Sequence, residues 1–365
     1  MRKPNRVLAG VLAAAALTRA LWAQEPARIQ QAERVLAPLV ECSGVSGMEG
    51  PVREAVQRLL PKWAKTETDT AGNLWLRLGH GDPVIVFVAH LDEIGYQVTG
   101  LGGDGSLEVT ARGGFFASLF EARPALVHTG QGDLPGVFVP RDSAATPLRH
   151  NPASLRVDVG TISREETEAL GIRAGQTVTS PKEFVRLAGT RATGRSFDDR
   201  VGASALILAV RRIDSARLRH TVIFLWSVRE EIGLEGARVA ANGLGLTPAR
   251  VHAIDTFVSA DSPLELTTFA LAPLGQGAVA RALDQSSVTP PAYVDTLVAL
   301  ARARKIPLQV GATNGGNDGS VFAPYGVPDV PIGWPLRYAH SPAEVIDLKD
   351  LVSLADLIQA VAEAW

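Results

Sequence analysis

Three apolar runs, each followed by an acidic or histidine residue, constrain this 365-residue chain more than any other feature. The runs and the polar residues that follow them are 84–89 with His90, 221–227 with Glu230, and 251–254 with Asp255. Runs of this length, rich in β-branched residues, are typical of strands buried on both faces of a parallel sheet. Open α/β sheets place their sites at the carboxyl ends of such strands, so we expect these polar side chains to meet at one edge.

Strand and helix patterns alternate over most of the chain, which predicts an α/β layered domain with a largely parallel central sheet. The composition agrees, because 46% hydrophobic residues are enough to fill a large core. The formal net charge of −2 favours neither nucleic acid nor an anionic membrane as a partner. The expected helices cover residues 29–39, 201–213, 233–241, 293–304 and 347–364.

Residues 93–182 have a different texture, with short alternating apolar segments separated by Gly, Asp and Pro. This spacing predicts a small β-rich insert, a barrel or a sandwich, that splits the catalytic domain into residues 24–92 and 183–365. The expected strands of the insert are 96–98, 107–110, 125–128, 135–139 and 177–178.

Residues 1–23 are expected to be a signal peptide, since a basic start precedes an apolar stretch from Val7 to about Leu17 and then small residues. The stretch is shorter than the roughly 20 residues that span a bilayer, so we expect an exported protein, periplasmic or secreted, without a membrane anchor after cleavage. One alternative is an uncleaved N-terminal anchor. The other is a wrongly chosen start codon, in which case the segment is not a signal and the protein is cytoplasmic. Cys42 is the single cysteine, which excludes an intrachain disulfide and a cysteine-based zinc site.

The polar residues form a set from which a pair of divalent metal ions is usually built. It comprises two imidazoles and several carboxylates, supplied by His90, Asp92, Asp198, Asp199, Glu230, Glu231, Asp255 and His340. A carboxylate has two oxygens, so Asp198, just before a helix, could bridge two ions. Each residue taken singly also has an ordinary structural interpretation, such as a helix cap or a surface pair. Imidazole and carboxylate ligands suit zinc or cobalt, and also manganese.

Glu230 and Glu231 are adjacent carboxylates that would repel each other unless a cation or proton compensates them. With metal present, one glutamate can be a ligand while the other removes a proton from water, as metal-assisted hydrolysis requires. Asp92 lies two residues after His90 and could accept a hydrogen bond from its second ring nitrogen. Two glycine-rich loops, residues 275–277 and 315–319, are expected to line a substrate groove. A serine hydrolase is excluded, because no Gly-x-Ser-x-Gly motif is present.

With these residues in order, the chain resembles the M42 family of dinuclear metallo-aminopeptidases, which contains glutamyl and deblocking aminopeptidases often mislabelled as endoglucanases. The resemblance covers nearly the whole mature chain. It rests on nine segments in the family's order: 43–49, 69–73, 90–95, 157–175, 198–202, 230–233, Asp255, 315–318 and 337–342.

The resemblance implies that His90 and Asp255 belong to one metal, that Glu231 and His340 belong to the other, and that Asp198 bridges them. It also implies Glu230 as general base and acid and Asp92 as the residue that orients His90. The family's insert is a PDZ-like β domain used for dimerisation, and its dimers build a dodecamer. The chain departs from the family pattern in its export signal, in residues 113–122 of the insert, and in Asn317, where a threonine is common.

The expected function is therefore removal of N-terminal residues from peptides with a free N-terminus. The alternative enzyme is a related metal-dependent amidase or deacylase that acts on N-acyl amino acids. The non-enzyme alternative is an exported binding protein on a peptidase fold. That alternative predicts loss of a ligand or of the base, and none is lost in this sequence.

Overall fold

The computed structural model describes residues 25–140, 154–245, 247–263, 265, 268 and 270–364, so the expected signal peptide lies outside the described residues. The large domain is built on an eight-stranded sheet. In spatial order its strands are β1 (Glu67–Thr68), β2 (Leu74–Leu78), β12 (Thr221–Ser227), β3 (Val84–His90), β13 (Arg250–Val258), β16 (Ile332–Leu336), β14 (Ala278–Leu283) and β15 (Leu308–Ala312).

The sheet is parallel at its centre and mixed as a whole. Strands β12, β3, β13 and β16 run parallel to one another, and β14 is parallel to β15. Strand β2 joins β12 antiparallel, and β14 joins β16 antiparallel. The expected parallel sheet is therefore found in the four strands that surround the candidate site.

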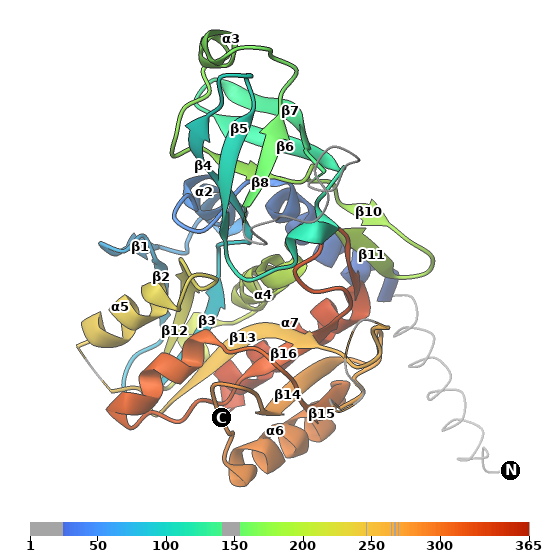
Figure 1. Cartoon of the computed structure of the whole chain (residues 1–365). Helices are drawn as coiled ribbons and strands as arrows, with labels where there is room; N and C mark the ends of the chain where they lie inside the picture. The colour runs from blue at the N-terminus through green and yellow to red at the C-terminus, as the bar shows by residue number, and fades with distance from the viewer. Residues whose placement is uncertain are drawn as a thin grey trace, which may run out of the picture.

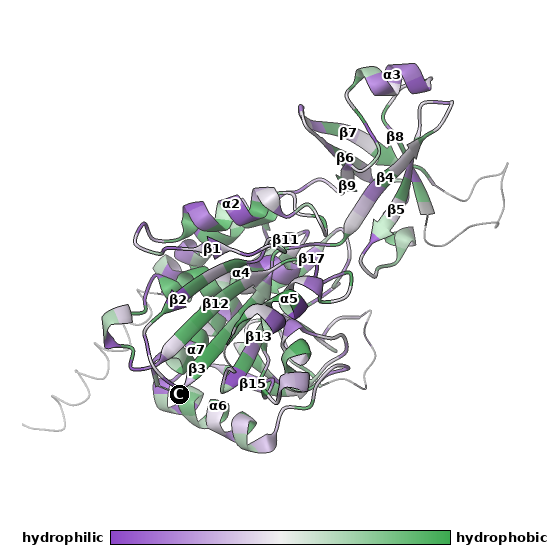
Figure 2. Ribbon diagram, turned by 90° about the vertical axis from the view of Figure 1, so that its left-hand side faces the viewer, coloured by the Kyte–Doolittle hydropathy of each residue, from purple (hydrophilic) through white to green (hydrophobic). Residues whose placement is uncertain are grey.

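Helices cover both faces of this sheet, so its central strands β3 and β12 are buried along their whole length (Figure 1 and Figure 2). Ile85, Phe87 and Ala89 of β3 pack in the main core, while Val84 and Val86 belong to a second core on the opposite face. The main core lies under helical residues 25–41, α2 (Gly50–Leu59), α4 (Phe197–Val210), α6 (Pro291–Arg304) and α7 (Leu348–Ala364). The second core lies under α5 (Glu235–Gly243) and the 3-10 helix η3 (Asp318–Tyr325).

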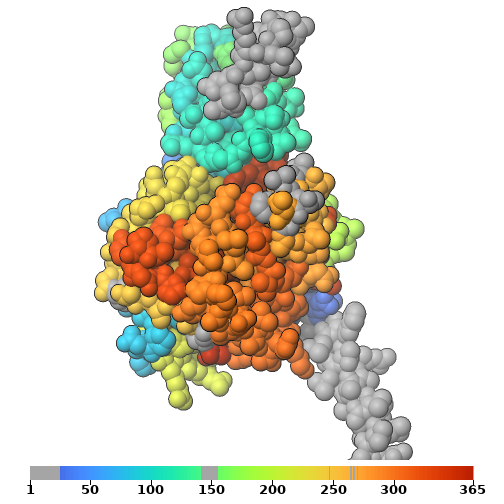
Figure 3. Space-filling view, turned by 60° about the horizontal axis from the view of Figure 1, so that its bottom comes forward, coloured from blue at the N-terminus to red at the C-terminus, as the bar shows by residue number. Residues whose placement is uncertain are grey.

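The insert is a closed six-stranded antiparallel barrel with its own core. Around the barrel the strands are β4 (Gly95–Leu101), β5 (Leu107–Arg112), β8 (Ser154–Asp158), β7 (Gly132–Phe138), β6 (Pro124–Thr129) and β9 (Thr177–Thr179). Two short helices, η1 (Ala117–Leu119) and α3 (Arg164–Ala169), lie in its loops. The barrel forms a separate lobe in the ribbon views, and the space-filling view shows that it sits directly on the large domain (Figure 3).

A buried ion network closes the neck between the barrel and the large domain. Glu93, just before β4, lies 2.5 Å from Lys182 Nζ, just after β9. The guanidinium of Arg195 in the large domain contacts the same carboxylate at 2.6 Å, and that of Arg200 lies 3.7 Å away. Although burial alone would raise it, the pKa of Glu93 stands well below its ordinary value because these cations stabilise the anion. The chain thus leaves and re-enters the large domain through one buried junction centred on the Glu93 carboxylate.

The predicted element boundaries differ from the observed ones at a few points. Helix α4 (Phe197–Val210) is kinked at Asp198 and Asp199, which have non-helical backbone angles, so its regular part begins close to the expected start at Val201. Strand β8 was not among the expected strands. A further three-stranded sheet consists of β10 (Val185–Arg186), β11 (Arg191–Gly194) and β17 (Glu344–Asp347), and η2 (Ser215–Arg217) is a short 3-10 turn. Within the described part of the chain, no helix is both long and apolar enough to cross a bilayer.

Candidate metal centre

The candidate site begins at the level of the sheet where β3 ends. His90 is the last residue of β3, and the register that pairs Ala253 with Val88 puts Asp255 beside it on β13. The apolar pattern had predicted that this strand ends at Asp255. Instead, β13 continues to Val258 by pairing with β16. His90 and Asp255 continue the alternation of residues buried under α5 and η3, so both side chains project from that face.

Asp198 lies between the two predicted imidazole ligands. It stands at the start of α4 with a non-helical backbone (φ −75°, ψ 106°), which directs its side chain away from the helix surface. Its Oδ1 is 3.1 Å from His90 Nε2, and its Oδ2 is 3.2 Å from His340 Nε2. One carboxylate therefore faces both histidines, each with a different oxygen.

The Glu230–Glu231 pair is held by its backbone. The Asp92 carboxylate accepts hydrogen bonds from the N–H groups of Glu230 at 2.9 Å and Glu231 at 3.1 Å, and from Ser46 Oγ at 2.6 Å. For His90 Nδ1, the nearest acceptor is the carbonyl of Asp92 at 3.1 Å, while the carboxylate lies 3.5 Å away. Asp92 thus orients His90 mainly through its main chain and orients the glutamate loop through its side chain.

His340 is fixed from two sides. The backbone of His340 has a positive φ of 57°, and its N–H donates a hydrogen bond to Glu344 Oε1 at 3.0 Å. Its Nδ1 lies 2.6 Å from the carbonyl oxygen of Gly114, which belongs to the barrel. A carbonyl can only accept, so Nδ1 carries the proton and Nε2 is left to face Asp198 and Glu231.

The five expected ligands fall into two groups whose ligand atoms lie within 4.8 Å of one another. The groups share Asp198: one contains His90, Asp198 and Asp255, and the other contains Asp198, Glu231 and His340. In the second group Glu231 Oε1 is 3.4 Å from His340 Nε2 and has no hydrogen-bond partner among the described residues. Lone pairs that face each other at this distance require a cation between them, a proton or a metal ion.

The electrostatics of the buried carboxylates point the same way. Burial raises the pKa of Asp255 to about 6, against the opposing effect of Arg281. Burial also holds the pKa of Glu230 well above its ordinary value, and the Asp255 carboxylate adds to this effect. Although burial alone would lower it, the pKa of His340 stands well above its ordinary value because Glu231 and Asp198 stabilise its charged form. The cluster therefore holds more negative charge than its two histidines balance, and this donor set of nitrogen and oxygen atoms fits divalent metal ions.

Three buried acids that are not among the five expected ligands support this geometry. Asp199 accepts hydrogen bonds from the N–H groups of His90 at 3.0 Å and Gly202 at 2.9 Å. Glu344 accepts from the N–H of Phe197 at 2.7 Å as well as from His340, which ties the two ligand loops together. The third, Asp318, accepts the hydroxyl hydrogen bond of Ser227 at the end of β12. The pairing of β11 with β17 that brings Glu344 to Asp198 has no local sequence signal.

The two glycine-rich loops have structural partners. Asn317 is fully buried, donates to Asp284 Oδ2 at 2.9 Å and accepts from the N–H of Gly319 at 2.7 Å. Asn317 was expected to line a substrate groove, but it instead holds the conformation of its own loop. The N–H groups of Gly275 and Gly277 both donate to the Asp350 carboxylate of α7, at 2.7 Å each.

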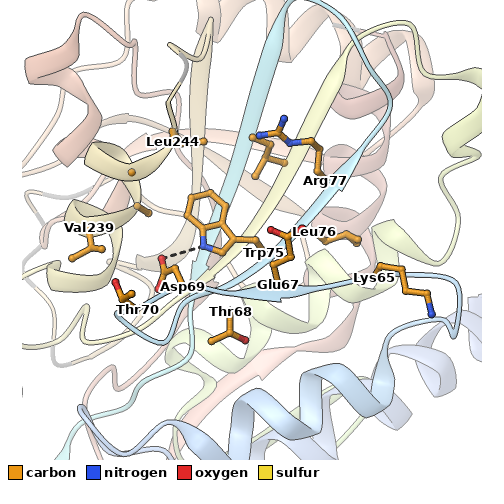
Figure 4. Close-up of a pocket in the computed structure, with 13 residues that line it drawn as sticks. Lys65, Glu67, Thr68, Asp69, Thr70, Trp75, Leu76, Arg77, Val239 and Leu244 are labelled. Carbon is orange, nitrogen blue, oxygen red and sulfur yellow. Dashed lines mark hydrogen bonds between the residues drawn. The ribbon is translucent and has the colours of Figure 1, made fainter.

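A separate cavity of about 770 Å³ lies between β2 and α5 (Figure 4). Trp75 stands at its centre and donates its indole N–H to Asp69 Oδ2 at 3.1 Å. Asp69 also accepts hydrogen bonds from the N–H groups of Ala71, Gly72 and Asn73, so it serves to close a turn. The residues that line this cavity include none of the candidate catalytic or metal residues.

Comparison with known proteins gives a consistent set of similarities. Residues 72–357 match the family model for M42 glutamyl aminopeptidase. The chain is 30% identical to lysyl aminopeptidase of Pyrococcus furiosus, over 90% of this chain and 96% of that protein. Among solved structures, aminopeptidase APDkam598 of Desulfurococcus kamchatkensis is 30% identical with a TM-score of 0.86, covering 92% of this chain and 96% of that one. The TET1 peptidase of Pyrococcus horikoshii, which can assemble into a tetrahedron or a large octahedral shell, is 32% identical with a TM-score of 0.82, covering 92% and 100%.

Proposed function

This chain belongs to the M42 family of glutamyl aminopeptidases and is a peptidase, and we propose that it releases N-terminal residues from peptides with the aid of two divalent metal ions. The observation that carries the proposal is the shared carboxylate of Asp198, whose two oxygens face His90 and His340 at 3.1 and 3.2 Å. This arrangement supports two adjacent cation positions joined by one bridging ligand.

One ion would be held by His90, Asp198 and Asp255, and the other by Asp198, Glu231 and His340. Zinc or cobalt suits these nitrogen and oxygen ligands, as does manganese. When bound, the ions would make a water molecule more acidic and would polarise the scissile carbonyl group.

Glu230 is the residue suited to move the proton. Its Oε2 lies 3.9 Å from His90 Nε2, so the carboxylate stands beside the ligands without being a member of either group. It would take a proton from the attacking water as the new C–O bond forms, and deliver it to the amine nitrogen as the C–N bond breaks. The backbone N–H groups of Glu230 and Glu231 both donate to the Asp92 carboxylate. These hydrogen bonds would hold the base and the neighbouring ligand at fixed positions relative to each other.

The assembly and the location of the protein are further parts of the proposal. The similarity to the Pyrococcus horikoshii TET1 peptidase supports a homo-oligomer. We propose a dimer or a dodecamer in which the barrel is the dimerisation domain. Light scattering of the purified protein would measure its mass. The basic and apolar residues 1–23 support export, and mass analysis of the N-terminus of the extracytoplasmic protein would locate the cleavage.

The proposed activity is tested with a panel of aminoacyl anilides and their N-acetylated counterparts, with and without a chelator. We expect release from free-amine substrates alone, lost on chelation and restored by zinc or cobalt. Cleavage of only the N-acetylated substrates would replace the aminopeptidase by a deacylase. No cleavage with any metal would overturn the proposal and favour a binding protein on this fold.

A further inference from the structure

The barrel reaches the candidate metal centre through a single short segment that follows β5. Gly113 and Gly114 leave the strand at the end nearest the neck, where Arg112 pairs with Gly95. The Gly114 carbonyl lies 2.6 Å from His340 Nδ1. The barrel thus contributes a hydrogen-bond acceptor to a residue of the large domain that is 226 positions away in sequence.

The close approach of this segment depends on a missing side chain. Gly113 has a φ of +96°, and a Cβ built on it would lie 2.6 Å from Ile94 Cγ2 and 3.4 Å from Glu231 Cβ. Real Cβ atoms do not tolerate the first of these distances, so any side chain here would require Ile94 or the segment itself to shift. The absence of a side chain at Gly113 therefore lets the segment pack closely on Ile94 of the barrel core, while the Gly114 carbonyl accepts from His340.

An aromatic side chain of the segment anchors it in the barrel core. The ring of Phe115 packs on Tyr96 at 5.1 Å between centroids in an edge-to-face geometry, and on Phe120 at 5.0 Å. The next residue, Phe116, is 78% exposed and takes no part in this packing. The position of the Gly114 carbonyl therefore follows the position of the barrel core.

The two candidate ligand groups differ in whether the barrel contacts them. His90 is oriented by the Asp92 carbonyl at 3.1 Å, and the whole group of His90, Asp198 and Asp255 belongs to the large domain. In the group of Asp198, Glu231 and His340, the ring of His340 binds the barrel segment through the Gly114 carbonyl. Glu231 lies on the side of Gly113 where a side chain would project, since a Cβ built there would be 3.4 Å from Glu231 Cβ.

We propose that the barrel is a working part of the metal centre, in which the Gly114 carbonyl holds His340 in the tautomer and orientation that bind one of the two metal ions. This inference rests on the proposed function, because it assigns a positioning role within the proposed two-metal site. Mutation of a group that orients a metal-binding histidine typically weakens metal affinity by roughly 10–100-fold. Displacement of the barrel segment should weaken one metal position by this factor and leave the other unchanged.

The test is calorimetric titration of the full metal-free protein with zinc and, separately, with cobalt, whose visible spectrum reports its coordination. We expect the parent protein to bind two equivalents. The variant Gly113→Ala should weaken one equivalent about 10–100-fold, change the cobalt spectrum of that equivalent alone, and leave the second equivalent as in the parent. Gly175→Ala is the matched control, since Gly175 in the barrel has a similar φ of +93° but a Cβ there would meet nothing within 4 Å.

A second variant keeps the test decisive if Gly113→Ala fails to fold. Phe115→Ala removes the aromatic anchor without adding an atom near Glu231, and it should weaken the same single equivalent, while Phe116→Ala should bind both equivalents as the parent does. Equal affinities in the parent and in every folded variant would overturn the inference, as would equal weakening of both equivalents. A parent protein that binds fewer than two equivalents would instead overturn the proposed two-metal function.

Discussion

Glu230 is the residue whose proposed role can be separated from metal binding most cleanly. It belongs to neither ligand group, yet its carboxylate stands 3.9 Å from His90 Nε2. The variant Glu230→Gln keeps the size of the side chain and removes its basicity. We expect kcat to fall by about 10²–10⁴-fold, because general-base catalysis contributes this much, while two metal equivalents remain bound.

The measurement is kcat on the best anilide substrate together with the metal content of the purified variant. Glu54→Gln is a suitable control, since Glu54 is 70% exposed on α2 and pairs only with Arg58 at 3.7 Å. Near-parental turnover by a metal-loaded Glu230→Gln protein would remove Glu230 from the mechanism.

At the scale of elements, the neck network joins the barrel to the sheet domain through one carboxylate. Glu93 compensates Lys182 and Arg195, which are as deeply buried as it is. The variant Glu93→Gln would leave these cations buried without a counter-ion, which typically costs about 3–5 kcal/mol of unfolding free energy. Denaturant unfolding measures this loss. Glu33→Gln, which breaks a partly exposed pair with Arg186, should cost less than about 1 kcal/mol.

A loss for Glu93→Gln no larger than that for Glu33→Gln would show that the neck does not depend on its central charge. The result would also distinguish the neck from the separate contact between Gly114 and His340.

The same network predicts how stability responds to acid. Burial opposes ionisation of Glu93, but Arg195, Lys182 and Arg200 outweigh it and hold the pKa below the ordinary value of 4.5. The folded state therefore binds fewer protons at this group than the unfolded state does. Its contribution is complete above pH 4.5 and is lost as the pH falls below that value. As the pH is lowered from neutral to well below 4.5, the unfolding free energy of the parent should approach that of Glu93→Gln. A difference between the two proteins that stays constant over this range would contradict the proposed role of the Glu93 charge.

At the scale of the whole molecule, metal ions should stabilise the folded chain, since the ligand groups join distant parts of it. Asp198, Glu231 and His340 come from three separate segments, and no such group exists in an unfolded chain. At a free metal concentration 100 times the dissociation constant, binding adds about 2.7 kcal/mol per site. We expect a chelator to lower the melting temperature and zinc or cobalt to restore it, as measured by calorimetry. Chelation that abolishes activity but leaves the melting temperature unchanged would contradict this expectation.

Much of the architecture could be predicted because it rests on local patterns. The apolar runs of β3 and β12 carry the signal of strands buried on both faces, and the alternating segments of residues 93–182 carry that of a small β domain. The five candidate ligands could also be named, because the motifs that contain them resemble, in order, those of a known family. Element ends were less certain: the apolar pattern stops at Asp255, whereas β13 continues to Val258 through its pairing with β16.

The layered fold and the inserted β domain therefore follow from strand and helix patterns that act over a few residues, and the candidate ligands follow from the resemblance of their motifs to a known family. The groups that support these ligands depend on long-range contacts of the folded chain. Glu344 reaches the backbone of Phe197 through the pairing of β11 with β17, and Gly114 reaches His340 from another domain. Such contacts join residues far apart in the chain, and a backbone carbonyl or a buried carboxylate has no sequence pattern that reveals its partner before the chain is folded.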